Sequence, residues 1–425
     1  MKEFLLFISI FFFSLQLASA RIYIPVDQSS DKKFPIAVVD LFGGEEGAEI
    51  GKIIRNDLEL SGYFNVLEPG LFENSAEQEG TTLETIQFGF WRSLETQALV
   101  KGSIEKERGE FIITLRLFDP FGPVMLVGKQ YVGKKENLRD IAHRFSDEIM
   151  EVLTGIRGVF TTHIAYVASK GKKSLEVSVM DMDGKRARRL TKNGVMNISP
   201  AWSSDGSHLV FTSYITGAPE IFSMRSNGRE MTRLTKDPGA KLTPLYTPSG
   251  SEIIYISTES GEAELSIMDA NGKNQRRLNT GFGIDISPDI SPDATEIVFA
   301  SERSGNLHLF KMNTDGSNVK RLTFVGYQND MPSWSPRADK IAFAGRDKGT
   351  FDIFIMNPDG SNIQRLTIRA GSNEHPTFSP DGRFIVFSST RSGSEQIYLM
   401  RTDGSNQMPI TTSGGRLPAW SPRLE

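Results

Sequence analysis

The 425-residue chain contains no cysteine, which excludes a disulfide framework and any metal site built from thiolates. Histidine is also scarce, with five copies at positions 143, 163, 208, 308 and 375. These positions share no metal-ligand spacing, so neither a metal nor another cofactor is expected. The alternative is a lyase-type metal site built from His308 and His375, but His308 falls within a predicted strand, where packing between blades is the expected role.

The chain also lacks an excess of charge of either sign, with 48 Lys and Arg against 52 Asp and Glu. A balanced composition gives no strong attraction for nucleic acid or anionic lipid, so neither is an expected partner. Long hydrophobic runs are absent after residue 17, and about 20 apolar residues are needed to cross a bilayer as a helix. Direct membrane insertion of the mature chain is therefore not expected.

The first twenty residues have the pattern of a secretory signal peptide. Lys2 precedes an apolar stretch over residues 4–17, and Ala18-Ser19-Ala20 supplies the small residues of a cleavage site. We expect residues 1–20 to be removed and the exported chain to begin at Arg21.

One pattern recurs at a fixed interval through the second half of the chain. An Asp-Gly or Asn-Gly pair appears six times, each 44 residues after the last. Runs rich in β-branched and aromatic residues flank each pair, which predicts strands joined by type I′ hairpin turns. The pairs are Asp183-Gly184, Asn227-Gly228, Asn271-Gly272, Asp315-Gly316, Asp359-Gly360 and Asp403-Gly404.

Each unit has two further landmarks, an Arg-Leu-Thr triplet and a Pro-x-aromatic-Ser-Pro-Asp-Gly segment. A unit of this length with four short strands is typical of a β-propeller blade. The first unit begins near His163 without its own Pro-x-aromatic segment, whereas the last such segment, at Pro418, has no unit of its own. The C-terminal strand is therefore expected to complete the first blade and to close a ring of six blades, as Velcro would.

Residues before the repeat do not show the 44-residue period. Apolar residues at 36–39 predict a buried strand, and apolar spacing of i, i+3 and i+4 over residues 50–58 and 138–153 predicts two helices. We expect a signal peptide over 1–20, an α/β N-terminal domain with an extended first segment over 21–155, and an all-β six-bladed propeller over 156–425.

The segments that enter the predicted innermost strands vary from unit to unit, while the rest of the repeat is uniform. In a propeller six copies of this segment converge on the mouth of the central channel. A mouth of mixed polar, charged and apolar groups suits a peptide or protein ligand, although ordinary loop variability gives the same pattern. The candidate binding residues are Ser199, Lys241, Thr243, Asp285, Asn329, Asp330, Glu374, His375 and Arg416.

With its repeat and export signal, the chain resembles the TolB family of the Tol-Pal cell-envelope system. The resemblance covers the whole mature chain and is most specific at Leu153-Thr154-Gly155-Ile156-Arg157-Gly158, Ile164-Ala165-Tyr166-Val167 and Pro418-Ala419-Trp420-Ser421-Pro422. It implies a non-enzymatic periplasmic scaffold, expected to be a monomer, that supports outer-membrane integrity and constriction during cell division. It also implies that a Pal-like peptidoglycan-associated lipoprotein binds at the channel mouth.

The resemblance further implies that a TolA-like inner-membrane protein binds the mature N-terminus. Its alternating pattern suits an extended strand that adds to a partner's sheet edge, although a frayed or self-docked terminus is the alternative. The residues concerned are Arg21, Ile22, Tyr23, Ile24, Pro25, Val26 and Asp27.

Two other function classes stay open on the sequence alone. A propeller enzyme, a lyase or hydrolase, would need acid, base or metal ligands that converge at the channel mouth, and no G-x-S-x-G nucleophile motif is present. A carbohydrate or small-ligand binder would need exposed aromatic residues at the mouth. Trp202, Trp334 and Trp420 instead belong to the repeat landmark, which predicts a structural role.

Overall fold

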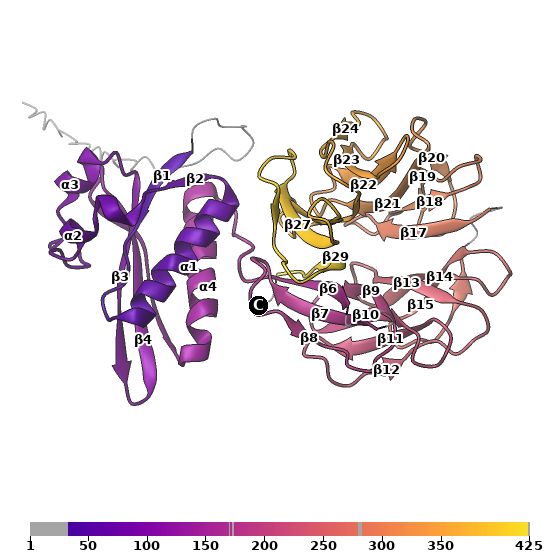
Figure 1. The fold of residues 1–425 in the computed structure, drawn as a ribbon, viewed down its shortest axis with the longest axis horizontal. Coiled ribbons are helices and arrows are strands. Elements are labelled where there is room, and N and C mark those ends of the chain that lie inside the picture. Colours follow the sequence, from indigo (N-terminus) through magenta and orange to yellow (C-terminus); the bar gives the residue numbers. More distant parts are fainter. Residues whose placement is uncertain (1–32, 170, 172–173, 279–282, 424–425) are drawn as a thin grey trace, which may run out of the picture.

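The first part of the chain forms a five-stranded sheet between two helical layers in the computed structural model, which describes residues 33–169, 171, 174–278 and 283–423 (Figure 1). The strand order is β2-β1-β3-β4-β5, in which β1 pairs in parallel with β2 and β3 and the remaining pairs are antiparallel. In chain order the elements are β1 (Phe34–Val38), α1 (Glu45–Ser61), β2 (Phe64–Val66), the 3-10 turn Pro69–Leu71, α2 (Glu73–Ala76), α3 (Phe88–Ser93), β3 (Ala98–Glu107), β4 (Glu110–Asp119), β5 (Val124–Gly133), the 3-10 turn Lys135–Asn137 and α4 (Leu138–Thr154).

Alternation along β1 explains the two layers. Ile36 and Val38 face the core under α1 and α4, whereas Ala37 faces the second core under α2 and α3. The predicted helix at 138–153 is confirmed as α4, which ends where Gly155 adopts a left-handed φ of 73° and donates its N–H to Glu151 O. None of the described helices combines the length and apolar character needed to span a bilayer.

Beyond α4, the described residues form six four-stranded sheets, which confirms the predicted propeller (Figure 1). From the innermost strand outward the six sheets are β29 (Arg416–Trp420), β6 (His163–Ser169), β7 (Leu175–Asp181), β8 (Arg188–Arg189); β9 (Asn197–Trp202), β10 (His208–Ser213), β11 (Glu220–Arg225), β12 (Thr232–Arg233); β13 (Lys241–Tyr246), β14 (Glu252–Ser257), β15 (Glu264–Asp269), β16 (Arg276–Arg277); β17 (Asp285–Ile290), β18 (Glu296–Ser301), β19 (His308–Asn313), β20 (Lys320–Arg321); β21 (Gln328–Trp334), β22 (Ile341–Arg346), β23 (Asp352–Met356), β24 (Gln364–Arg365); β25 (Asn373–Phe378), β26 (Phe384–Ser389), β27 (Gln396–Arg401) and β28 (Met408–Pro409).

The ring closes as the sequence predicted. The C-terminal strand β29 pairs antiparallel with β6, with Trp420 opposite Ile164. Trp420 Nε1 donates to Thr162 Oγ1 at 2.8 Å, and Ser421 N donates to His163 O at 2.8 Å. The first blade is therefore built from both ends of the propeller.

The Asp-Gly turns differ from the expected type I′ form. Gly184 N donates to Asp181 O at 2.9 Å, so Met182 and Asp183 are the central residues of the turn and Gly184 follows them. The glycine takes a positive φ of 83°, and Asp183 does not. The glycine of the pair is thus the last residue of the turn and has a left-handed conformation. Only glycine adopts this conformation without strain.

The two ends of the propeller are distinct. We call the end at which the innermost strands begin the mouth face, and the opposite end the domain face. The N-terminal domain packs on the domain face, where Arg401 Nη1 donates to Gly62 O and the Arg383 and Arg401 guanidinium groups lie 5.1 and 5.0 Å from the Tyr63 ring. The described contacts of the N-terminal domain do not include the mouth face.

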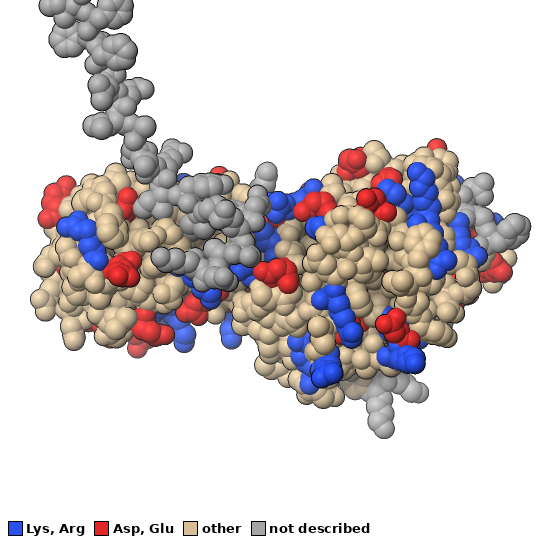
Figure 2. All heavy atoms as spheres, turned by 90° about the horizontal axis from the view of Figure 1, so that it is seen from above, with Lys and Arg blue, Asp and Glu red and all other residues tan. Residues whose placement is uncertain are grey.

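The predicted signal peptide, 1–20, and the predicted partner-binding segment, 21–27, lie outside the described residues. The predicted domain boundary at residue 155 falls between α4 and β6. Lys and Arg are interspersed with Asp and Glu over the described residues of the face in Figure 2, in keeping with the balanced composition.

Candidate functional site

The innermost strand of every blade carries one non-glycine residue in the left-handed region. The pairing register shifts beside each of these residues, so each sits at a β-bulge. Proline follows each one, and a residue before proline ordinarily adopts extended backbone. The six residues and their φ angles are Ser199 (50°), Thr243 (47°), Ser287 (50°), Met331 (54°), His375 (54°) and Leu417 (51°).

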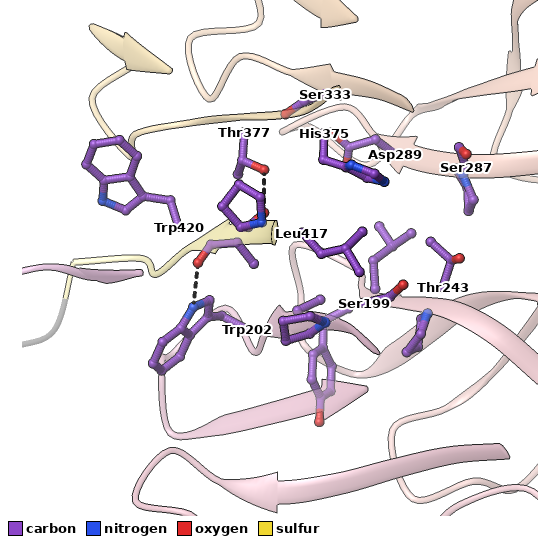
Figure 3. A pocket seen from close by; sticks show the side chains of 18 of the residues that line it. Ser199, Trp202, Thr243, Ser287, Asp289, Ser333, His375, Thr377, Leu417 and Trp420 are labelled. Carbon is purple, nitrogen blue, oxygen red and sulfur yellow. Dashed lines mark hydrogen bonds between the residues drawn. The ribbon is translucent and has the colours of Figure 1, made fainter. Parts of the chain in front are cut away.

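We call these six residues the channel ring. They line one cavity of about 400 Å³ on the propeller axis, and Figure 3 shows Ser199, Thr243 and His375 directed toward the same space. Holding a non-glycine residue in this conformation costs on the order of 1 kcal/mol or more, and such strain concentrates at functional sites. A sixfold repetition of a strained position around one cavity makes the ring the candidate functional site.

The ring is chemically divided. Three consecutive blades contribute hydroxyl groups from Ser199, Thr243 and Ser287. The other three blades contribute Met331, His375 and Leu417, of which two are apolar. The channel therefore presents a polar half and a largely apolar half to a ligand.

Three of the six channel-ring residues are among the candidate residues named from the sequence. Ser199, Thr243 and His375 line the cavity together with Ser287, Met331 and Leu417, which were not among the predicted residues. The signal that identifies all six is the fixed position before the proline of each repeat landmark.

Three of the predicted residues point into the blades instead of the channel. Lys241, Asp285 and Asn329 lie near the beginning of their innermost strands and are 0%, 0% and 5% exposed. Lys241 Nζ donates to Pro238 O at 2.5 Å, Arg303 Nη2 lies 2.9 Å from Asp285 Oδ2, and Asn329 Nδ2 donates to Val325 O at 2.8 Å. Because side chains alternate along a strand, the side chains at these positions point into the blade. There they bind the loops that surround the mouth.

The remaining predicted residues, Asp330, Glu374 and Arg416, immediately precede ring residues. Asp330 is buried and accepts the Met331 N–H at 2.7 Å, and its burial raises its pKa above the ordinary range. Glu374 accepts a hydrogen bond from Ser372 Oγ at 2.6 Å, and Arg416 pairs with Glu395 at 3.0 Å. Partner contact by any of the nine residues stays a prediction.

His375 is a neutral member of the ring. Burial, followed by the nearby positive charge of Arg416, lowers the pKa of the His375 imidazole to about 4. Its Nδ1 atom is buried and has no hydrogen-bond partner among the described residues. His308 lies on β19 instead, 3.3 Å from Thr323 Oγ1, so the two histidines do not form the metal site considered above.

Asp289 is an acidic residue of the cavity wall that the sequence analysis missed. Its carboxylate accepts N–H groups from Ile290 at 2.9 Å and from Trp334 at 2.6 Å, so both oxygens are engaged by backbone. Burial outweighs these bonds and raises the pKa of Asp289 to about 6. The available signal was its position directly after the repeat proline, where the other five units carry Ala, Leu, Ser, Thr and Ala.

We expect the stability of the protein to depend on pH through Asp289. Because the folded-state pKa is raised from 3.8 to about 6, the stabilising contribution is complete below pH 3.8 and is lost as pH rises through 6. Relative to Asp289→Asn, the wild-type protein should lose up to about 3 kcal/mol between pH 4 and 8. Melting temperatures of both proteins across that range measure this difference.

Asp293→Asn is the control, since hydrogen bonds from Ser291 and Thr295 lower the pKa of the exposed Asp293 carboxyl. Its difference from wild type should be constant from pH 5 to 8. A constant difference for Asp289→Asn as well would show that Asp289 stays ionised in the folded protein.

A second charged cluster joins the two domains. Arg139 on α4 bonds to Asp181, with Nε 2.8 Å from Oδ2, and to Asp183, while Arg186 Nε also lies 2.8 Å from Asp181 Oδ2. His143 Nδ1 lies 2.8 Å from Asp57 Oδ2 on α1. Burial alone would lower the pKa of His143, but the Asp57 carboxylate outweighs this effect and raises the pKa of the imidazole above its ordinary value.

This cluster includes the one group of described residues with metal-ligand spacing. Ligand atoms of His143, Asp181 and Asp183 lie within 4.8 Å of one another. The Arg139 guanidinium already supplies the positive charge to both carboxylates, so the arrangement fits an ion-pair network between domains better than a cation site.

Comparison with known proteins identifies both parts of the chain. The family model described as TolB beta propeller domain matches residues 150–424, and the TolB amino-terminal domain model matches residues 22–122. A solved structure, TolB from Acinetobacter baumannii, superposes with a TM-score of 0.82 at 25% identity and covers 92% of this chain and 98% of that chain.

Curated relatives carry the name Tol-Pal system protein TolB. The one from Desulfosudis oleivorans is 36% identical over 208 residues, which is 47% of this chain and 47% of that protein. The one from Hydrogenovibrio crunogenus is 37% identical over 213 residues, or 48% of each chain. The matched part thus spans about half the length of these relatives. Since the propeller model alone matches more than half of the residues, the chain belongs to the TolB family.

Proposed function

We propose that this chain is a non-enzymatic periplasmic scaffold of the Tol-Pal system. In this proposal it binds a Pal-like lipoprotein at the channel mouth and a TolA-like protein through its mature N-terminus, residues 21–27. By linking the two it supports outer-membrane integrity and invagination during cell division. Membership of the TolB family and the predicted export signal support this role.

The channel ring is the observation that carries the proposal. Six strained residues with different side chains surround one cavity, as expected of a surface that recognises a particular protein. The described part of the N-terminal domain contacts the propeller at the domain face, so a folded partner at the mouth would leave those contacts intact.

An enzymatic role fits the cavity less well. Its titratable lining residues are Tyr246, Asp289 and His375. Both oxygens of Asp289 already accept backbone N–H groups, and the low pKa of His375 makes it a weak base near neutral pH. A scaffold needs none of the acid, base or metal chemistry that a lyase or hydrolase would require.

A pull-down from envelope extract tests the proposal. The bait is the mature protein starting at Arg21, compared with one lacking residues 21–30 and one carrying Glu374→Ala and His375→Ala. We expect the mouth variant to lose only the Pal-like lipoprotein and the truncation to lose only the TolA-like protein. Met231→Ser, on the domain face, is the matched control and should retain both.

Failure of the intact bait to retain either partner would refute the scaffold role. The cavity should then be tested for glycan and metal binding, the chemistry of the two alternative function classes.

A further inference from the structure

Exposed hydrophobic side chains are unevenly divided between the two ends of the propeller. Among the described residues of the blades, from β6 onward, nine large hydrophobic side chains are exposed. Seven lie on loops of the mouth face, and two, Met231 and Ile363, lie on turns of the domain face. The seven are Met196, Ile215, Ile284, Phe324, Val325, Tyr327 and Ile368. Apolar side chains gathered on one face mark a surface that another molecule covers.

The most exposed of these side chains come from two neighbouring loops. Phe324, Val325 and Tyr327 are 71%, 67% and 56% exposed in the loop between β20 and β21. Ile368 is 63% exposed in the next such loop, between β24 and β25. We call these four residues the apolar arc.

The arc continues the apolar half of the channel ring. The loop that holds Phe324 leads into β21, which carries Met331, and the loop that holds Ile368 leads into β25, which carries His375. The hydroxyl half of the ring belongs to the other side of the channel, on β9, β13 and β17. The exposed apolar side chains of the rim therefore lie in the same sector as the largely apolar half of the channel ring.

Two arginines border the arc with their charge uncompensated. The Arg321 guanidinium lies 5.0 Å from the Phe324 ring centre, and that of Arg346 lies 5.7 Å from the Tyr327 ring centre. Their hydrogen bonds go to neutral oxygens, from Arg321 Nε to Thr323 O at 2.7 Å and from Arg346 Nη2 to Gln328 Oε1 at 2.7 Å. No carboxylate of the described residues forms an ion pair with either arginine.

We propose that the apolar arc docks a protein surface whose apolar side chains are bordered by carboxylates, and that the lipoprotein partner of the proposed function supplies it. Stacking on aromatic rings fixes the two guanidinium groups before binding, so they can accept carboxylates with little loss of side-chain entropy. Aromatic residues and arginine are enriched at protein interfaces, and the arc with its border supplies both. This inference rests on the proposed function and adds the sector and the chemistry of the contact.

Calorimetric titration with the purified soluble part of that lipoprotein tests the inference. Phe324→Ser with Ile368→Ser should weaken the affinity of the mature protein by at least about tenfold, and Arg346→Glu should do the same. Arg346→Lys keeps the charge and should lose less than Arg346→Glu. Met231→Ser with Ile363→Ser, the matched pair on the domain face, should stay within about twofold of wild type. Of the five positions, Arg346 is half-buried and the other four are exposed, and equal melting temperatures will show that each variant is folded.

The outcomes separate the two proposals. If wild-type protein binds the lipoprotein and the arc variants bind equally well, the arc inference is wrong and the proposed function stands. If wild-type protein does not bind it, the proposed function fails and the arc inference fails with it. Sedimentation of the unliganded protein tests a third case. If the wild-type protein is a dimer and the arc substitutions dissociate it, the arc is a contact between copies of this chain and the inference is wrong.

Discussion

A protein that ends at Gly415 is expected to lose the cooperative unfolding of the propeller. The truncation removes β29, the innermost strand of the first sheet, and exposes the edge of β6. It also removes Trp420, which is 6% exposed and stacks on Phe384 of the sixth blade with ring centres 6.3 Å apart. The ring then opens at its seam, because no other strand can pair with β6 on that side.

The loss of stability on this truncation should be large. Removing one buried tryptophan costs about 3–5 kcal/mol, and the strand pairing and its hydrogen bonds add to this. We expect the melting temperature to fall by at least about 10 °C, or the calorimetric transition to broaden until no single transition is left. The control is a protein that ends at Arg423, which keeps all of β29. A melting temperature within a few degrees of full length after truncation at Gly415 would contradict ring closure by the C-terminal strand.

Arg139→Leu is expected to destabilise the protein by about 3 kcal/mol, because it breaks the ion-pair network between the domains. Arg139 pairs with Asp183, whose side chain is 3% exposed, and with Asp181, whose side chain is 6% exposed. Asp181 keeps Arg186 after the substitution, but Asp183 is left as a buried carboxylate without its cation. Chemical denaturation measures the free energy of unfolding.

The ion pair between Lys129 and Glu148, 3.2 Å apart with side chains 42% and 30% exposed, provides the control. Lys129→Ala should cost less than about 1 kcal/mol, because solvent screens such pairs. Adding Asp183→Asn to Arg139→Leu should recover part of the loss, since it removes the unpaired charge. A loss below about 1 kcal/mol for Arg139→Leu would mean that the network does not hold the domains together.

The repeat made the propeller predictable. Six turns in register and a missing landmark at His163 were sufficient to place the strands and the closure at Trp420. Likewise, the apolar spacing of α4 predicted a helix that ends at Gly155. These features depend on local patterns, which a sequence carries directly.

Features that depend on backbone conformation or on distant neighbours were not predictable in the same way. The left-handed conformation of Thr243 opposes the ordinary preferences of a β-branched residue before proline, so local rules predict the opposite. Lys241 was predicted at the mouth because it lies in the variable segment that enters an innermost strand, yet its side chain lies inside the blade. Arg139 and Asp181 meet only because the two domains pack together, and no spacing in the sequence reports that contact.

The arrangement separates two tasks. The domain face holds the N-terminal domain through charged and aromatic contacts, as between Tyr63 and Arg401. The mouth face presents the channel ring, with Ser199 on its polar side and Met331 on its apolar side. A partner at the mouth would not compete for surface with the described residues of the N-terminal domain, as the proposed binding of two proteins requires.

Titration of the purified mature protein with the soluble domains of the two proposed partners, each alone and then both together, is the decisive test of the two-surface scaffold. We expect one binding site for each partner, formation of a ternary complex, and loss of the TolA-like partner alone when residues 21–30 are removed. Absence of binding by the Pal-like domain, or competition between the two domains for one site, would contradict the two-surface scaffold.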